Sequence, residues 1–233
     1  MILLFWKTGC IKLALYKVFS FDKVPSTQTT AIDLIEQRRA ADHCVIVAAA
    51  QSDGRGRFHR KWVSHHGNLY ASFIYACPER DARLSYAVAV AVADTLLSFG
   101  IAPMIKWPND ILVDGKKISG ILIEYYGRFV VVGIGINIAT NPTVAEYKTT
   151  KTDDFVKVSV NDVLGKLMKY LDKWIRADFQ NVRERWMAMA VGLDTSVKYR
   201  GNVAQLKGIN ENGALVLLCG TRYVLAYGDE ITI

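Results

Sequence analysis

A run of small apolar residues, 44–50, leads directly into a loop in which glycines alternate with arginines. Such a run predicts a buried strand. The loop that follows covers residues 51–62 and contains Gly54 and Gly56. Because glycine adopts backbone angles that are closed to other residues, this loop can bend sharply round a ligand. We therefore expect the chain to be organised around a buried strand that leads into a flexible loop.

The same loop is strongly basic. It carries one carboxylate, Asp53, and four cations, which are Arg55, Arg57, Arg60 and Lys61. Backbone N–H groups of such a loop can cradle a phosphate while guanidinium groups hold its oxygens. The spacing matches neither the dinucleotide-binding glycine motif nor the P-loop. The sequence thus predicts a phosphate site of another kind, with a solvated basic surface loop as the alternative.

The remainder of the first 190 residues predicts strands and helices in mixed order. Strands are expected over residues 13–21, 68–76, 111–113, 121–125 and 129–138. Helices are expected after Ser26 or Thr27, over residues 82–99, and from a cap at Asn161 to about residue 190. Residues 141–157 are polar and predict a surface loop.

The character of the chain changes near Val191. Five short β-type runs follow, at residues 196–200, 203–207, 214–218, 223–226 and 230–233, and tight turns separate them. This pattern predicts a small β-barrel. We therefore place a domain boundary near Val191 and expect two domains, residues 1–190 and residues 191–233, of which the second is the barrel.

The formal net charge of +7 favours anionic partners. Residues 191–233 carry as many acidic as basic groups, so the whole excess lies in the first domain. The four cysteines are far apart, and no secretory signal is recognisable, which predicts free thiols in a reducing cytoplasm. The apolar residues 1–6 suit a strand but are too short for a membrane span, so no membrane association is expected.

Two pairs of polar residues stand at the ends of predicted elements. One hydroxyl of Ser26 and Thr27 is expected to cap the helix, which leaves the other for a ligand. Asn109 and Asp110 follow a proline at a strand end and predict a turn. A carboxylate beside a phosphate loop also suits Mg²⁺, and the sequence leaves the plain turn and the metal site open.

The strand expected over residues 129–138 contains features that need a partner. Gly133 and Gly135 weaken a strand unless a ligand or a second backbone comes close. Asn137 is polar in an otherwise apolar run and requires a hydrogen bond, from neighbouring backbone or from a ligand.

Four motifs, in this order and spacing, resemble the biotin–protein ligases (biotin–acetyl-CoA-carboxylase ligases). They lie at residues 51–62, 106–110, 115–122 and 133–137. The resemblance covers nearly the whole chain and implies an α+β fold. Its catalytic domain would be class II synthetase-like, with a mixed sheet flanked by helices, and an SH3-like domain would follow. It also implies two half-reactions: biotin and MgATP give biotinyl-5′-AMP, and a lysine of the biotin carboxyl carrier domain then takes the biotinyl group.

The resemblance assigns roles position by position. The residues that match biotin- and adenylate-binding positions are Ser26, Thr27, Gln28, Gln51, Arg55, Gly56, Arg57, Trp62, Lys117, Gly120 and Gly133. Lys117 and Arg57 match the groups that act on the reacting atoms. Asn109, Asp110 and Asn137 match positions used for ATP and its Mg²⁺.

Three features depart from the family pattern. Gln28 stands where asparagine is usual, and His59 stands where glycine is usual. If the backbone at His59 needs a positive φ, this residue costs about 1 kcal/mol. Only about a dozen residues precede the first predicted strand, so the helix-turn-helix of repressor-type members is not expected, nor is specific DNA binding. The sequence leaves a homodimer open.

Two other functions remain as alternatives. A lipoate ligase or octanoyl transferase shares the implied fold and the transfer of an acyl group to lysine, but the Gly/Arg loop and the motif at residues 106–110 argue against it. A nucleic-acid-binding module would suit the positive charge. However, the predicted barrel is neutral and has no basic–aromatic stripe.

Overall fold

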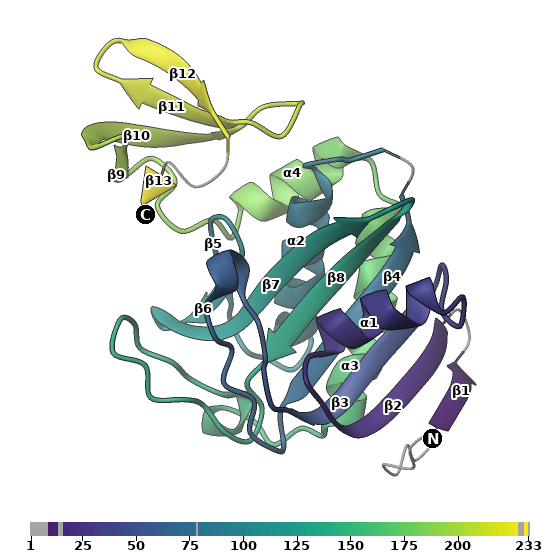
Figure 1. Ribbon diagram of the computed structural model, residues 1–233. Coiled ribbons are helices and arrows are strands. Elements are labelled where there is room, and N and C mark those ends of the chain that lie inside the picture. The colour runs from purple at the N-terminus through teal and green to yellow at the C-terminus, as the bar shows by residue number, and fades with distance from the viewer. Residues whose placement is uncertain (1–8, 14–15, 78, 228–230, 233) are drawn as a thin grey trace. The chain divides into compact units, whose positions relative to one another are not determined.

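The structure is a computed structural model that describes residues 9–13, 16–77, 79–227 and 231–232 (Figure 1). The strand considered for residues 1–6 lies outside the described residues. The chain forms two compact units, each built from two stretches of sequence. Unit 1 combines Met1–Arg80 with Lys116–Lys166, and unit 2 combines Asp81–Gly115 with Leu167–Ile233. Neither unit coincides with residues 1–190 or 191–233, so the boundary near Val191 stays a prediction.

Unit 1 contains six strands in the order β1-β2-β3-β4-β8-β7. Their bounds are β1 Gly9–Leu13, β2 Tyr16–Val24, β3 Cys44–Gln51, β4 Leu69–Ala76, β7 Lys116–Tyr126 and β8 Phe129–Ile136. The pair β2 and β3 is parallel and the other pairs are antiparallel, which confirms the mixed sheet. A parallel pair needs a crossover connection, and helix α1 (Thr27–Glu36) provides it.

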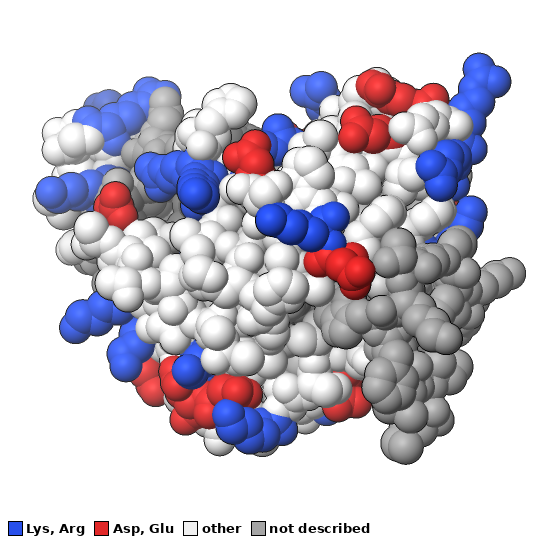
Figure 2. Space-filling view, turned by 60° about the horizontal axis from the view of Figure 1, so that its bottom comes forward, with Lys and Arg blue, Asp and Glu red and all other residues white. Residues whose placement is uncertain are grey.

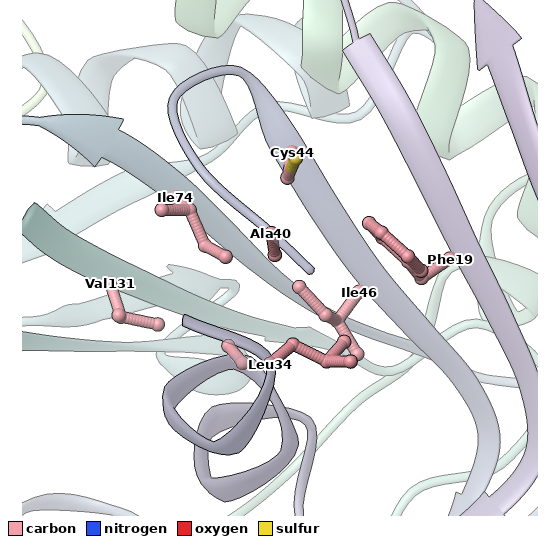
Figure 3. Close-up of a cluster of buried hydrophobic side chains, with 8 residues drawn as sticks. Phe19, Leu34, Ala40, Cys44, Ile46, Ile74 and Val131 are labelled. Carbon is pink, nitrogen blue, oxygen red and sulfur yellow. The ribbon is translucent and has the colours of Figure 1, made fainter. Parts of the chain in front are cut away.

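One face of the unit 1 sheet packs against α1 (Figure 1). In Figure 3, Leu34 from α1 lies against Ile46 of β3, with Ile74 of β4 and Val131 of β8 in the same cluster. These four side chains are buried. This packing places α1 on the sheet beside β3. The candidate site is built from the N-terminal end of α1 and the C-terminal end of β3.

Unit 2 is organised around the apolar helix α2 (Leu84–Leu97), whose expected burial is confirmed. Helices α3 (Val160–Ile175) and α4 (Phe179–Met187) supply partners for its one buried carboxylate, Asp94. Trp174 Nε1 donates to Asp94 Oδ2 at 2.9 Å, and Arg185 Nη2 donates to Asp94 Oδ1 at 2.6 Å. A buried charge is tolerated here because it is paired and hydrogen-bonded.

The chain of unit 2 also forms a hairpin, β5 (Met104–Lys106) with β6 (Asp110–Val113), and a second sheet. The second sheet has the order β12-β11-β10-β9-β13 and is antiparallel throughout. Its strands are β9 Ser196–Tyr199, β10 Asn202–Ile209, β11 Leu215–Cys219, β12 Arg222–Ala226 and β13 Ile231–Thr232. This agrees with the five predicted runs and is consistent with an SH3-like domain.

Three local predictions are wrong. The first strand does not begin at Leu13, because β1 ends there and β2 begins at Tyr16. Asn161 does not cap α3 but lies inside it, whereas Ser159 Oγ accepts a hydrogen bond from the backbone of Asp162. The helical run to residue 190 is broken after α3.

None of the described helices is both long enough and apolar enough to cross a membrane.

Candidate functional site

The Gly/Arg loop, residues 54–62, is a narrow turn that closes on itself at the end of β3. The backbone N–H of Trp62 donates to the carbonyl of Gly54 at 2.7 Å, and that of Gly56 donates to Arg60 at 2.7 Å. A Cβ atom at Gly54 would lie 2.4 Å from the Trp62 carbonyl oxygen. Glycine is required at this position because the backbone on the other side of the loop approaches so closely.

Gly54 and Gly56 do not use the positive φ angles that are open to glycine. Gly56 has a φ of −113°, and Gly54 is not among the glycines with positive φ. The positive angles of the loop fall instead on Phe58 and His59, at 54° and 58°. His59 therefore does have the positive φ that was considered from the sequence. The loop holds two side chains in this conformation, which costs about 1 kcal/mol or more for each.

Trp62 packs on a floor made by two glycines. Gly120 of β7 and Gly135 of β8 face each other across the strand pair. Cβ atoms at these positions would lie 2.8 Å and 2.6 Å from the Trp62 ring. In the same way, a Cβ atom at Gly133 would lie 2.6 Å from Gln28 Oε1. These positions in β7 and β8 require glycine because side chains, and not a second backbone, pack closely against the strands.

A buried polar cluster lies at the N-terminal end of α1. Ser26 caps the helix, since its Oγ accepts a hydrogen bond from the backbone of Gln28 at 3.2 Å. Thr27 Oγ1 and its backbone N–H both donate to Gln51 Oε1, at 3.2 Å and 2.8 Å. Ser72 Oγ, from β4, lies 2.9 Å from Thr27 Oγ1 and 3.0 Å from Gln28 Oε1. Of the two hydroxyls, Ser26 is thus the cap, while Thr27 belongs to the cluster.

Lys117 lies beside a cavity of about 320 Å³, a volume that suits a small molecule. Its Nζ is 5.4 Å from the centre of the Trp62 ring and 5.0 Å from that of Tyr147. The cavity is lined by both aromatic residues, by Lys117 and Asn137, and by residues 142–147. A cation is therefore held between two aromatic faces at the edge of a cavity, which favours an anionic ligand there.

Asn137 is held rigidly beside this cavity. Its Nδ2 donates to the carbonyl of Thr150 at 3.0 Å, and its backbone N–H donates to that of Ile118 at 2.9 Å. Its Oδ1 is buried and has no hydrogen-bond partner within the described part of the chain; the same is true of Trp62 Nε1 and Ser119 Oγ. Buried polar atoms of this kind cost about 1–3 kcal/mol each unless a ligand or water satisfies them. Trp62 and Asn137 both line the cavity, which makes it the candidate binding site of unit 1.

The two loop arginines named by the sequence make different contacts. Arg55 forms an ion pair with Glu124 of β7, with 3.3 Å between Nη2 and Oε2. The guanidinium of Arg57 lies over the ring of Phe58, at 5.2 Å. Arg55 thus ties the loop to the sheet of unit 1.

Asn109 and Asp110 lie in unit 2. The predicted turn is present: β5 ends at Lys106, and Asp110 begins β6 opposite it. The Trp107 ring of the same turn packs against Tyr86, with 5.4 Å between ring centres. Every other residue of the predicted site belongs to unit 1.

Sequence reasoning missed two members of the site, Ser64 and Ser72. Ser72 carried a signal, because it is a polar residue in the apolar strand β4, as Asn137 is in its own apolar run. Ser64 carried none, since a serine beside a loop is ordinary. Its importance comes from a contact with Gln51, thirteen residues away in the sequence.

Comparison with known proteins agrees with this geometry. Residues 20–141 match the biotin/lipoate A/B protein ligase family. A biotin--[acetyl-CoA-carboxylase] ligase of Paracoccus denitrificans is 34% identical over 202 residues, which cover 74% of this chain and 82% of that protein. The chain belongs to this family.

Two further relatives place the ligase within it. The bifunctional ligase/repressor BirA of Bacillus subtilis is 32% identical over 221 residues, covering 84% of this chain and 67% of that protein. The solved structure of a biotin protein ligase from Aquifex aeolicus, in complex with biotin and ATP, superposes with a TM-score of 0.82 at 25% identity. It covers 92% of this chain and 97% of its own. The predicted resemblance to biotin–protein ligases is confirmed.

The glycine floor leads to a first prediction. In Gly135→Ala, a methyl group would lie 2.6 Å from the Trp62 ring, so the closed loop should be destabilised by about 1–3 kcal/mol. Trypsin should then cleave the loop about tenfold faster than in the unaltered ligase. Gly165→Ala is the control, because no atom lies within 4 Å of its Cβ position. Equal cleavage of both variants would show that Trp62 does not rest on this floor.

Proposed function

We propose that the ligase activates biotin with ATP to biotinyl-5′-AMP and transfers the biotinyl group to a lysine of a biotin carboxyl carrier domain. The observation that carries this proposal is the placement of Lys117 at the cavity, between Trp62 and Tyr147, with buried unsatisfied polar atoms nearby. The family assignment supplies the reaction class, and the cavity offers a site for anionic reactants.

In the first half-reaction, a carboxylate oxygen of biotin attacks the α-phosphorus of ATP. A new oxygen–phosphorus bond forms. The bond between the α-phosphorus and the oxygen that bridges to the β-phosphate breaks, and pyrophosphate leaves with its electron pair. Both reactants are anions, and the site must reduce their repulsion. We assign this task to Lys117 and Arg57, which also stabilise the charge that develops on the phosphoryl oxygens. No nucleophile of the enzyme is needed.

In the second half-reaction, the lysine amine of the carrier domain attacks the carbonyl carbon of the mixed anhydride. AMP leaves, an amide forms, and the amine proton passes to solvent. The anhydride is prone to hydrolysis, so water must be excluded between the two steps. Closure of the Gly/Arg loop provides this, with Trp62 and the segment Arg55, Gly56 and Arg57 over the adenylate.

Biotin recognition is assigned to the polar cluster and to Gly120 and Gly133. Thr27 and Gln51 offer hydroxyl and amide groups for the ureido ring, with the helix cap Ser26 and with Gln28 beside them. The apolar part of biotin suits the surface along β7 and β8, where Gly120 and Gly133 expose backbone. Gln28 donates to the carbonyl of Val131 on β8, which its side chain reaches because it is longer than that of the asparagine usual in the family.

Asn137 in unit 1 is assigned to ATP, and so, from the family resemblance, are Asn109 and Asp110 in unit 2. Asn137 Oδ1 is a buried oxygen acceptor with no partner in the described residues, and an oxygen of this kind would suit Mg²⁺. Asn109 and Asp110 supply an amide and a carboxylate of the type that Mg²⁺ prefers. When bound, the ion would neutralise charge on the phosphates.

The proposal includes a carboxylase carrier domain as macromolecular partner and the cytoplasm as location. Cys44, Cys77 and Cys219 form no disulfide among the described residues, as expected in a reducing compartment. The proposal leaves a homodimer open. On the face shown in Figure 2, lysines and arginines are interspersed with carboxylates among the described residues, which does not favour a nucleic-acid-binding module.

The roles of Lys117 and Arg57 can be tested by substitution. Lys117→Ala and Arg57→Ala should each lower biotin-dependent pyrophosphate exchange by about 100-fold or more, because each removes a charge from the transition state. Lys116→Ala is a matched control, since this neighbouring lysine is exposed. Exchange at the original rate in the Lys117 and Arg57 variants would refute these assignments.

Substrate choice separates the ligase from its lipoate-specific relatives. Calorimetry should show saturable binding of biotin and no comparable binding of lipoate, because lipoate has no ureido group for Thr27 and Gln51. Tighter binding of lipoate would favour the alternative function.

The backbone strain at His59 gives a further expectation. His59→Gly relieves the left-handed penalty of about 1 kcal/mol, so the biotin-bound loop should resist trypsin at least as well as in the unaltered ligase. His59→Ala keeps the Cβ atom and should show no such gain. Faster cleavage of His59→Gly in the biotin-bound state would mean that the imidazole itself holds the loop.

A further inference from the structure

A series of close polar contacts runs from β8 to the segment after the Gly/Arg loop. Within it, the single hydroxyl proton of Ser72 serves either Gln28 Oε1 or Thr27 Oγ1. At its inner end, Gln28 Nε2 donates to the carbonyl of Val131 at 3.0 Å. This leaves Gln28 Oε1 to face Ser72 Oγ, 3.0 Å away. Ser72 and Gln28 are buried, so this end of the series is shielded from water.

The middle of the series fixes the orientation of Gln51. Thr27 directs two donors, its backbone N–H and its hydroxyl, at Gln51 Oε1. Since both donors require the oxygen, the amide nitrogen of Gln51 must point the other way. There it donates to Ser64 Oγ at 2.8 Å.

Ser64 forms the outer end. Its hydroxyl has one proton, which it donates to the Trp62 carbonyl at 3.1 Å, while the oxygen accepts from Gln51. The Trp62 backbone N–H in turn closes the loop on Gly54. A Cβ atom at Gly54 would lie within 3 Å of Trp62 O, Ser64 Oγ and Gln51 Nε2. All three groups therefore meet at a point that only glycine leaves open.

The chain on the far side of Ser64 is anchored independently. Tyr70 OH, from β4, donates to the carbonyl of His65 at 2.7 Å. Burial raises the pKa of Tyr70 to about 12, so the phenol keeps its proton at neutral pH. Ser64 thus lies between the anchored residue His65 and the loop. A change in the position of Gln51 would reach the Trp62 carbonyl through the Ser64 hydroxyl.

We propose that Ser64 is a positioning residue that couples biotin binding at Thr27 and Gln51 to closure of the Gly/Arg loop. The inference rests on the proposed function, because it takes the polar cluster as the ureido site. Biotin that engages Gln51 immobilises the amide, and the amide, through Ser64, holds the Trp62 carbonyl and the base of the loop. Without the hydroxyl, biotin still meets Thr27 and Gln51, but the loop closes independently of it.

The matched variants Ser64→Thr and Ser64→Val test this idea, because their side chains have the same shape and differ only in the hydroxyl. Three quantities are measured on the full chain: biotin affinity, the rate at which preformed biotinyl-AMP is released, and protection of the loop from trypsin by biotin. Ser64→Val should release biotinyl-AMP about tenfold faster, the effect of one hydrogen bond, with biotin affinity changed much less. It should also lose the protection that biotin gives, and Ser64→Thr should restore both.

Ser52→Ala is the control, since Ser52 is an exposed serine beside Gln51. It should behave as the unaltered ligase does. Thermal unfolding of each variant separates loss of coupling from loss of fold, and the Thr and Val variants should have the same midpoint. Equal release and equal protection in these two variants would overturn the role of Ser64. Absence of biotin-dependent pyrophosphate exchange in the unaltered chain would instead overturn the proposed function.

Discussion

The close contact between Trp62 and the paired glycines of β7 and β8 is the constraint on which the candidate site depends. A methyl group on either Gly120 or Gly135 would occupy the space of the indole ring. Because the ring lies close to both glycines, the loop that ends at Trp62 is held near the two strands, and Lys117 lies beside the ring. The position of the loop thus depends on Gly120 in β7 and Gly135 in β8, because neither has a side chain that would displace Trp62.

The polar cluster and the cationic groups divide the work of the site. Thr27 and Gln51 lie at the N-terminal end of α1 and the C-terminal end of β3, the two elements that the core in Figure 3 packs together. Lys117 and Arg57 bring positive charge toward reactants that would otherwise repel each other. The cluster provides recognition and the cations provide charge stabilisation. The hydroxyl of Ser64 is the link through which we infer that the first affects the second.

The local chemistry of this chain was largely predictable, but its contacts were not. The strands β3, β4 and β8 and helix α2 follow from apolar runs, and the cap at Ser26 follows from a hydroxyl before a helical pattern. The reason for Gly54 was predicted wrongly because the sequence shows that a residue lacks a side chain, without showing what approaches it. For the same reason, Ser64 looked like an ordinary loop residue.

The sequence alone determined the reaction class, since four motifs in a fixed order match the biotin–protein ligases. It also determined the five C-terminal strands, because periodicity and turn residues act over short distances. The mixed sheet followed from the family resemblance. Only the tertiary structure decided which polar groups meet: Gln28 with Val131, Gln51 with Ser64, and Asn137 with Thr150. Such contacts depend on strand order and register, which bring together residues that local sequence patterns cannot relate to one another.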